Sequence, residues 1–471
     1  MSGLRERLER LRAAAQASEA AEAALAGETG GAAESVASEG GGGQGDRRGS
    51  GGNRSGVAAE RVDGNDARVH PGFRSIGVEE ISNDGGSFLL RRIAYPLPYM
   101  HGRYGLEELP DCAASLTPVA ARQNQAREAA PVEASRMLFL DTETTGLGVG
   151  AGNVPFMVGF GYYAEGAFVV EQTLIRHPGE ERAMLEYLLT HLKDKDHLVT
   201  YNGRTFDWPV LVNRYIMNGW RTNGAEPGHL DFLHPSRALW RKTLVSCRLA
   251  VVEEERLGFL RGEDVPGTMA PALYVQYLND GNPAHLHGVY THNEKDVLTL
   301  AALAVHFARL LEDRPDEDER DDESGEELYC TASWLEKHGQ LAHAERLYDR
   351  LAERADAGTA AWCLPLAARY KKLGSNERAV ALWEAIAASA EQAQLPRPDA
   401  FVELAMHYEH RTKDPLTALS YARRALELLG RRARMLRSTA SRSDEREKLQ
   451  RRVDRLQAKI GRMPNAGRSS E

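Results

Sequence analysis

Two carboxylates separated by a single residue, Asp141 and Glu143, stand in the segment DTETTG at residues 141–146. The four apolar residues before them, MLFL, predict a short buried strand. Because residues i and i+2 of a strand point to the same face, both side chains are expected to project together. Like charges this close raise each other's pKa unless a cation compensates, and a hard divalent ion is the usual compensation. The pair therefore predicts a metal site at this end of the strand.

A phosphodiester-cleaving site with two divalent ions draws carboxylates from several elements, and two further acids stand at suitable places. Asp207 follows the strand-like run HLVTYN and a Gly-Arg turn, directly before Trp208 and Pro209. Taken alone it is more typical of a helix N-cap. Asp296 lies in HNEKDVLTLAAL, near the start of an apolar helix, where an ordinary solvated acid is the simpler interpretation. Neither residue alone indicates a site.

The elements that would position these acids follow in a regular order. The runs 154–163 and 167–175 predict two more strands joined by a turn, and residues 181–192 have apolar side chains at helical spacing. A strand over 197–202, a helix after Pro209 and a helix over about 289–311 complete the segment. This order predicts an α/β fold of the ribonuclease-H-like type, a mixed sheet with flanking helices.

Three motifs in sequence, DTETTG, YNGRTFDWPVL and HNEKDVLTLA, carry a family resemblance. Together they resemble the YprB-type ribonuclease-H-like domain of the DEDD 3′-5′ exonuclease superfamily, over about residues 135–312. The resemblance implies that Asp141, Glu143, Asp207 and Asp296 bind two divalent ions, Mg²⁺ or Mn²⁺. It implies further that water attacks a terminal phosphodiester of a nucleic acid and releases nucleotides in the 3′-to-5′ direction.

The same resemblance implies which residues contact the substrate. Thr144 and Leu147, just past the first motif, are expected at the terminal nucleotide. Asn202 and Phe206 are expected to shape the cleft for the strand. Asp231, in the segment HLDFLHP, is either a structural cap or a support for the site.

The general base departs from the better-known patterns of the superfamily, which place a His five residues, or a Tyr four residues, before the last Asp. Here those positions hold Thr291 and His292. Because the unperturbed pKa of His, near 6.5, suits proton transfer at neutral pH, we expect His292 to be the catalytic base. The alternative is that His292 only caps or lines its helix.

A region of helical repeats is expected beyond the nuclease segment. Gly339, Ala344 and Tyr348 recur 35 residues later as Gly374, Ala379 and Trp383, and more loosely as Ala418 and Tyr421. Small residues at this spacing let paired helices pack closely, which resembles tetratricopeptide repeats. Such repeats imply a protein partner. Generic helical hairpins are the alternative.

These patterns also predict where the folded parts of the chain begin and end, and which linkers lie between them. Residues 27–56 contain 12 glycines in 30 positions, which cannot bury enough apolar surface to fold. The boundaries are 1–69 for an N-terminal helix and Gly-rich linker, 70–134 for a family-associated extension, 135–312 for the exonuclease domain, 313–327 for an acidic linker, 328–430 for the helical repeats and 431–471 for a basic tail.

Charge is distributed too unevenly for the net value of −9 to exclude a polyanionic partner. Residues 313–327 hold ten acids against two arginines, whereas residues 431–462 hold twelve basic residues against four acids. The basic tail either contacts phosphates or is a solvated helix. The four cysteines are far apart, which argues against a zinc ribbon or a disulfide framework. No apolar run approaches the roughly 20 residues of a membrane span, and a cytoplasmic location is expected.

The sequence therefore favours a metal-dependent nuclease, a 3′-5′ exonuclease acting on single-stranded nucleic acid, with repeats that recruit a partner. A structure-specific endonuclease on the same fold is one alternative. A nucleic-acid-binding scaffold with little catalysis, acting through its helical repeats, is another. The sequence offers no base-contacting motif, so it does not separate DNA from RNA.

Overall fold

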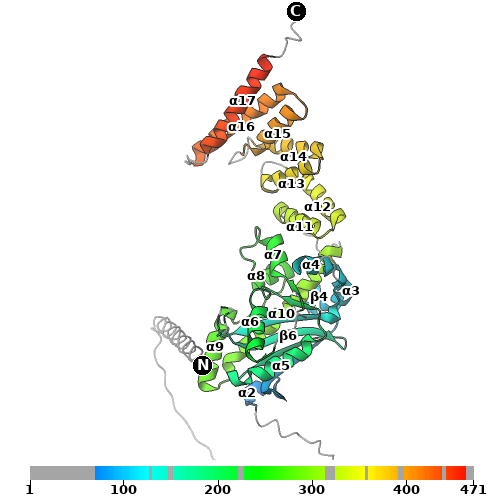
Figure 1. Cartoon of the computed structure of the whole chain (residues 1–471), viewed down its shortest axis with the longest axis vertical. Helices are drawn as coiled ribbons and strands as arrows, with labels where there is room; N and C mark the ends of the chain where they lie inside the picture. The colour runs from blue at the N-terminus through cyan, green and yellow to red at the C-terminus, as the bar shows by residue number, and fades with distance from the viewer. Residues whose placement is uncertain are drawn as a thin grey trace, which may run out of the picture. The chain divides into compact units, whose positions relative to one another are not determined.

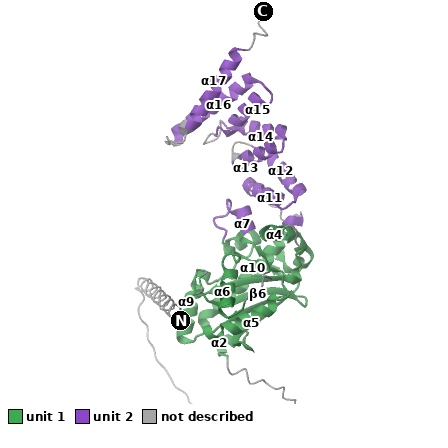
Figure 2. Ribbon diagram, in the orientation of Figure 1, with its two compact units in different colours: residues 1–233, 248–308 green, residues 234–247, 309–471 purple. Residues whose placement is uncertain are grey.

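The structure is a computed structural model that describes residues 69–126, 130–146, 148, 150, 152–220, 227–312, 324–355, 359–390, 397–436 and 442–462. The chain divides into two compact units, one of Met1–Leu233 with Arg248–Ala308 and the other of His234–Cys247 with Arg309–Glu471 (Figure 2). The helix expected near the N-terminus and the Gly-rich linker lie outside the described residues.

A seven-stranded mixed sheet forms the centre of the first unit (Figure 1). Its strand order is β1-β2-β7-β6-β5-β8-β9. β8 pairs in parallel with β5 and with β9, and the other neighbours are antiparallel. The predicted mixed sheet with flanking helices is confirmed. The strands are β1 (Val78–Asn83), β2 (Gly86–Pro96), β5 (Met137–Thr144), β6 (Pro155–Ala164), β7 (Ala167–Leu174), β8 (His197–Thr200) and β9 (Gly228–Asp231).

The segment before the nuclease motifs contributes to this same sheet. β2 pairs with β7 along eight residues, from Leu89 opposite Leu174 to Pro96 opposite Ala167. A two-stranded ribbon, β3 (Met100–His101) with β4 (Tyr104–Gly105), follows β2. Residues 78–96 therefore extend the sheet, and they place β7 between two paired neighbours, β2 and β6.

Alternation along β6 places helices on opposite faces of the sheet, since successive strand residues point to opposite sides. Phe160 packs against Tyr187 and His191 of α5 (Glu181–Leu192). The neighbouring Gly159 faces Asn293 of α10 (Ala284–Glu312), where an added Cβ would collide with the Asn293 side chain. The glycine thus lets α10 lie close against β6.

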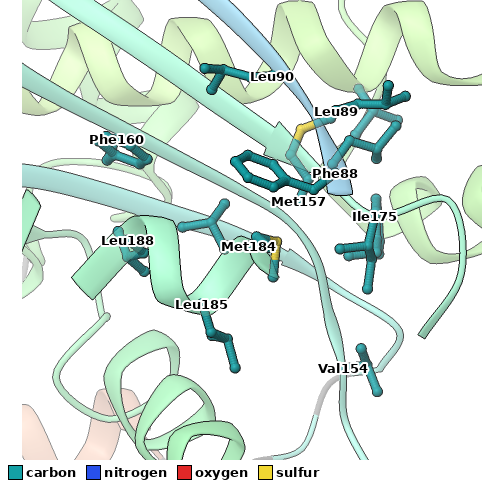
Figure 3. Packing of buried hydrophobic residues seen from close by; sticks show 14 of the residues in the cluster. Phe88, Leu89, Leu90, Val154, Met157, Phe160, Ile175, Met184, Leu185 and Leu188 are labelled. Carbon is teal, nitrogen blue, oxygen red and sulfur yellow. The ribbon is translucent and has the colours of Figure 1, made fainter. Parts of the chain in front are cut away.

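The apolar core lies between the sheet and α5 and includes Phe88, Phe160, Met184, Leu185 and Leu188 (Figure 3). These side chains are buried in both elements, which is the expected result of helical spacing on one side and strand alternation on the other. The remaining helices of this unit are α2 (Pro71–Arg74), α3 (Leu109–Cys112), α4 (Thr117–Gln123), α6 (Asp207–Met217), α8 (Leu249–Val252) and α9 (Ala270–Asp280).

The second unit is all-helical over the residues that the structure describes. The hairpins repeat the expected features: Gly339 and Gly374 both have φ +83°, and Ala344 and Ala379 are fully buried. None of the described helices is long and apolar enough to cross a membrane. The helices are α7 (Leu233–Trp240), α11 (Gly325–Lys337), α12 (Leu341–Glu353), α13 (Ala360–Lys372), α14 (Asn376–Ser389), α15 (Asp399–His410), α16 (Pro415–Leu436) and α17 (Arg442–Gly461).

The helix α17, in the basic segment, buries one apolar stripe. Leu449 packs with Phe401 of α15 and Leu428 of α16, and Leu456 packs in a second cluster with Ala405 and other residues of those helices. Its other side chains are mostly exposed and charged. The helix therefore packs against α15 and α16 through this stripe.

Candidate active site

The first two acids stand near the carboxyl end of β5, an interior strand of the sheet. Asp141 lies opposite Gly159 of β6, and Glu143 lies opposite Met157. The side-chain amide of Asn293 in α10 donates to Asp141 Oδ2 at 2.8 Å. Glu143 is only 8% exposed. A strand thus presents both carboxylates to the face that α10 covers.

Asp207 is the first residue of α6 and is 6% exposed. It accepts a hydrogen bond from the hydroxyl of Thr142, the residue between the two acids of β5. The N-cap position belongs to Phe206, so Asp207 does not occupy the capping position itself. The turn before it is held by buried Asp231, which accepts from the backbone N–H groups of Asn202 at 2.8 Å and Arg204 at 3.2 Å.

His292 and Asp296 lie one turn apart on α10. His292 Nε2 is 3.5 Å from Asp296 Oδ2. The other ring nitrogen, Nδ1, is 2.9 Å from Oδ2 of Asp264. Burial opposes ionisation of Asp264, but its hydrogen bonds with His292 and Arg261 hold its pKa below the ordinary value. A carboxylate therefore orients the imidazole from the side away from Asp296.

An arginine joins the acids in this site. Arg261 donates from Nη2 to Asp296 Oδ1 and from Nε to Glu253 Oε2, and its Nη1 lies 3.2 Å from Asp264 Oδ2. Burial alone would lower the pKa of Arg261, but the carboxylates around it outweigh this effect and raise the pKa above its ordinary value. A permanent positive charge is thus placed against the fourth acid.

The four carboxylates influence one another electrostatically. Burial and then the charges of Asp296 and Asp207 raise the pKa of Asp141 well above its ordinary value, although Asn293 and Arg261 oppose this. Burial and then Asp141, Asp296 and Asp207 do the same for Glu143. Burial raises the pKa of Asp207 to about 6 and raises that of Asp296 too. Such a set of buried oxygens is stabilised by a cation.

Hard divalent ions prefer carboxylate oxygens, so the chemistry of these four side chains fits Mg²⁺ or Mn²⁺. Within the described part of the chain, no group of three or more His, Cys, Asp or Glu side chains is already spaced to hold an ion.

Comparison with known proteins places this geometry in a family. A family model described as the RNase_H superfamily matches residues 138–308, which contain all four acids. The chain is also 36% identical over 344 residues to a Bacillus subtilis (strain 168) protein named "Uncharacterized protein YprB", a match covering 72% of this chain and 80% of that protein. The chain belongs to the RNase H superfamily.

The residues that the sequence predicts to contact the substrate differ in how far they are exposed to solvent. Thr144 is buried, and its hydroxyl donates to the Gly146 carbonyl at 2.7 Å. Asn202 is exposed with φ +71°, and Phe206 is half-buried at the start of α6. Leu147 lies outside the described residues.

Sequence reasoning missed the residues that hold the acids of this RNase H superfamily site. Asn293 stands inside the third motif, next to His292, and its role could have been suspected from that position. Gln172 donates to Asn293 Oδ1 at 2.9 Å and lies in a strand read only for its apolar alternation. Arg261 and Asp264 lie in the irregular segment GFLRGED, where no periodicity marks them.

Proposed function

We propose that this chain is a divalent-metal-dependent 3′-5′ exonuclease that hydrolyses single-stranded nucleic acid from its end. The observation that supports it most is the gathering of four buried or half-buried carboxylates from β5, α6 and α10 on an RNase H superfamily fold. Their raised pKa values indicate a site that gains stability when a cation binds.

Asp141, Glu143, Asp207 and Asp296 would hold Mg²⁺ or Mn²⁺, and two ions is the stoichiometry we expect. When bound, such ions polarise a phosphodiester and lower the pKa of water. The chain's own part is to orient the oxygens that receive them. Asn293 fixes Asp141, and Thr142 fixes Asp207, through the hydrogen bonds described above.

His292 is proposed as the base that takes the proton of the attacking water. If its Nδ1–H donates to Asp264, the Nε2 lone pair faces the acids and can accept a proton. Asp264 then stabilises the imidazolium that forms. Arg261 Nη1 also lies near this ring, 3.3 Å from His292 Nδ1.

The substrate strand would approach past the turn between β8 and α6. Asn202 is exposed there, and its Oδ1 accepts from the Thr205 hydroxyl at 2.9 Å, which fixes its orientation. We propose that Asn202 and Phe206 contact the strand. Thr144 and Leu147 would meet the terminal nucleotide, Thr144 through the shape of its turn because its hydroxyl is engaged locally.

The test is digestion of single-stranded DNA and RNA labelled at the 5′ end, with Mg²⁺ or Mn²⁺, by the full-length protein and by Asp141→Asn. We expect a ladder of products that shorten from the 3′ end and that Asp141→Asn does not form. Cutting of closed circles would instead favour a structure-specific endonuclease. If nothing is digested and Asp141→Asn binds Mn²⁺ as well as the parent, the proposal is wrong.

We also propose that the helical hairpins of the second unit are tetratricopeptide-like and bind a protein partner. The support is the equivalence of Ala344 and Ala379, both fully buried where paired helices meet. Ala344→Trp and Ala379→Trp should each overpack a hairpin and lower the melting temperature of the helical unit by similar amounts. Circular dichroism would measure this, and tolerance of either tryptophan would contradict the equivalence.

A further inference from the structure

Arg261 belongs to a buried chain of charged and polar groups that extends away from the acids. Its side chain is 8% exposed and that of Glu253 is 0% exposed. Glu253 Oε1 in turn accepts from the Thr299 hydroxyl and lies 3.2 Å from His101 Nε2. His101 comes from the β3-β4 ribbon, about 150 residues away in the sequence. The position of Arg261 is therefore fixed through Glu253, which is itself contacted by Thr299 of α10 and His101 of the β3-β4 ribbon.

The backbone around Glu253 is shaped for this contact. A π-helical turn, Glu253–Leu257, follows α8 and ends at Gly258, whose φ is +68°. π-helical turns often occur at functional sites, since they re-aim side chains at some cost in helix stability. Phe259, the next residue, stacks on His101 at 4.0 Å between ring centroids. These contacts fix the course of the chain from Gly258 to Arg261, and the Arg261 side chain then reaches Asp296.

Side chains of the protein consequently lie beside both oxygens of Asp296. Oδ1 accepts from Arg261, and Oδ2 faces His292 Nε2 at 3.5 Å. A divalent ion that uses Asp296 has to share or displace the guanidinium, because both compete for the same negative charge. Among the described residues, no cationic side chain bonds to Asp141 or Asp207, which accept from the neutral donors Asn293 and Thr142.

We propose that Arg261 is a built-in counter-ion that competes with a divalent ion for Asp296, so that the two ions of the proposed site bind with unequal affinity. The inference rests on the proposed function. One ion is held by the acids that have only neutral partners. The other, which needs Asp296, binds weakly until the phosphate of a substrate supplies further oxygens and Arg261 turns toward that phosphate.

The experiment is calorimetric titration of Mn²⁺ into the full-length protein without nucleic acid. Arg261→Met alone would strand the buried charge of Glu253, so the main variant is Arg261→Met with Glu253→Gln, which removes both charges together. We expect the parent to bind one ion tightly and the double variant to bind the weaker ion at least about tenfold more tightly. Arg261→Lys should be intermediate.

Arg92→Met with Glu171→Gln is the matched control, because Arg92 pairs with fully buried Glu171 on the α5 face of the sheet and both charges are again removed together. It should leave both Mn²⁺ affinities unchanged. Unchanged or weaker binding by the Arg261 double variant would overturn the inference, since a residue that merely orients Asp296 would weaken binding when lost. If the parent and Asp141→Asn bind Mn²⁺ equally, the proposed function itself fails, which is a distinguishable result.

Discussion

At the scale of residues, the candidate site concentrates negative charge where the fold gives it little solvent. Glu143 and Asp207 are each less than a tenth exposed, and of the four acids it is Asp296 that the charged Arg261 contacts. The carboxylates of β5 and α6 receive neutral hydrogen bonds instead. The folded protein therefore holds these acids at a cost in stability, and a cation would recover it.

This arrangement predicts how the metal-free protein responds to pH. The pKa of Asp207 rises from an ordinary value near 3.8 to about 6 on folding, so the folded state binds more protons than the unfolded state in that window. Stability then falls as pH rises from about 4 to 6 and stays lower above it. In excess EDTA, the melting temperature should be higher at pH 5 than at pH 7.5.

Saturating Mn²⁺ should remove this difference, because ions favour the ionised acids. Scanning fluorimetry at both pH values, with EDTA or Mn²⁺, measures it. Asp207→Asn supplies the control, since it should raise the metal-free melting temperature at pH 7.5. A metal-free protein that is more stable at pH 7.5 than at pH 5 would contradict the prediction.

A second prediction separates a residue that would hold the ion from one that orients it. Loss of a group that only orients a ligand typically costs about 10- to 100-fold. Thr142→Val removes the hydroxyl that donates to Asp207 and should lower kcat/KM within that range. Asp207→Asn should lower it by more than about 100-fold. Equal losses in the two variants would show that Asp207 acts only through its hydrogen bond.

The sequence pointed to the candidate acids, but it did not point to the residues that surround them. Asp141 and Glu143 followed from strand alternation, which depends on neighbouring residues alone. Arg261 could not be predicted, because its placement depends on Glu253 and His101, which are 152 residues apart in the chain. Contacts of that kind leave no periodic signal.

At the scale of elements, the site depends on how closely α10 approaches β6. Gly159 allows Asn293 to lie against the strand and reach Asp141. The sequence predicted strands at β5, β6 and β7 from their apolar runs, and the helix α10 from apolar residues at helical spacing. It missed β9, because Gly228–Asp231 contains a single apolar residue, Leu230.

Gly159→Ala tests this approach. The added methyl group would collide with the Asn293 amide, so we expect a loss of about 1–3 kcal/mol in unfolding free energy and at least about tenfold in kcat/KM. Denaturant unfolding and digestion rates measure the two effects. Adding Asn293→Ala should make room for the methyl group and recover stability, while activity stays low because Asp141 has lost its donor. Recovery of both would mean that Asn293 does not position Asp141.

At the scale of the whole molecule, the chain is built from two units whose cores are formed differently. The first unit packs a sheet against helices, and in the second unit the apolar clusters of the described residues join helices that are near one another in the chain. When helices pack only in this stepwise way, each gains stability from the helices beside it. α17 is such a neighbour for α15 and α16, whose apolar residues it covers.

Leu456→Asp therefore tests whether α17 stabilises the helical unit alone. Leu456 is fully buried, so an aspartate there brings an unpaired charge into an apolar cluster and should cost about 3 kcal/mol or more. Arg451→Ala is the control on the same helix, because Arg451 is 72% exposed and should be close to neutral. Circular dichroism at 222 nm should show an earlier helical transition for Leu456→Asp only. The transition of the sheet-containing unit should keep its midpoint, since the core cluster of its described residues includes none from α17. A shift of that transition as well would mean that the two units unfold as one.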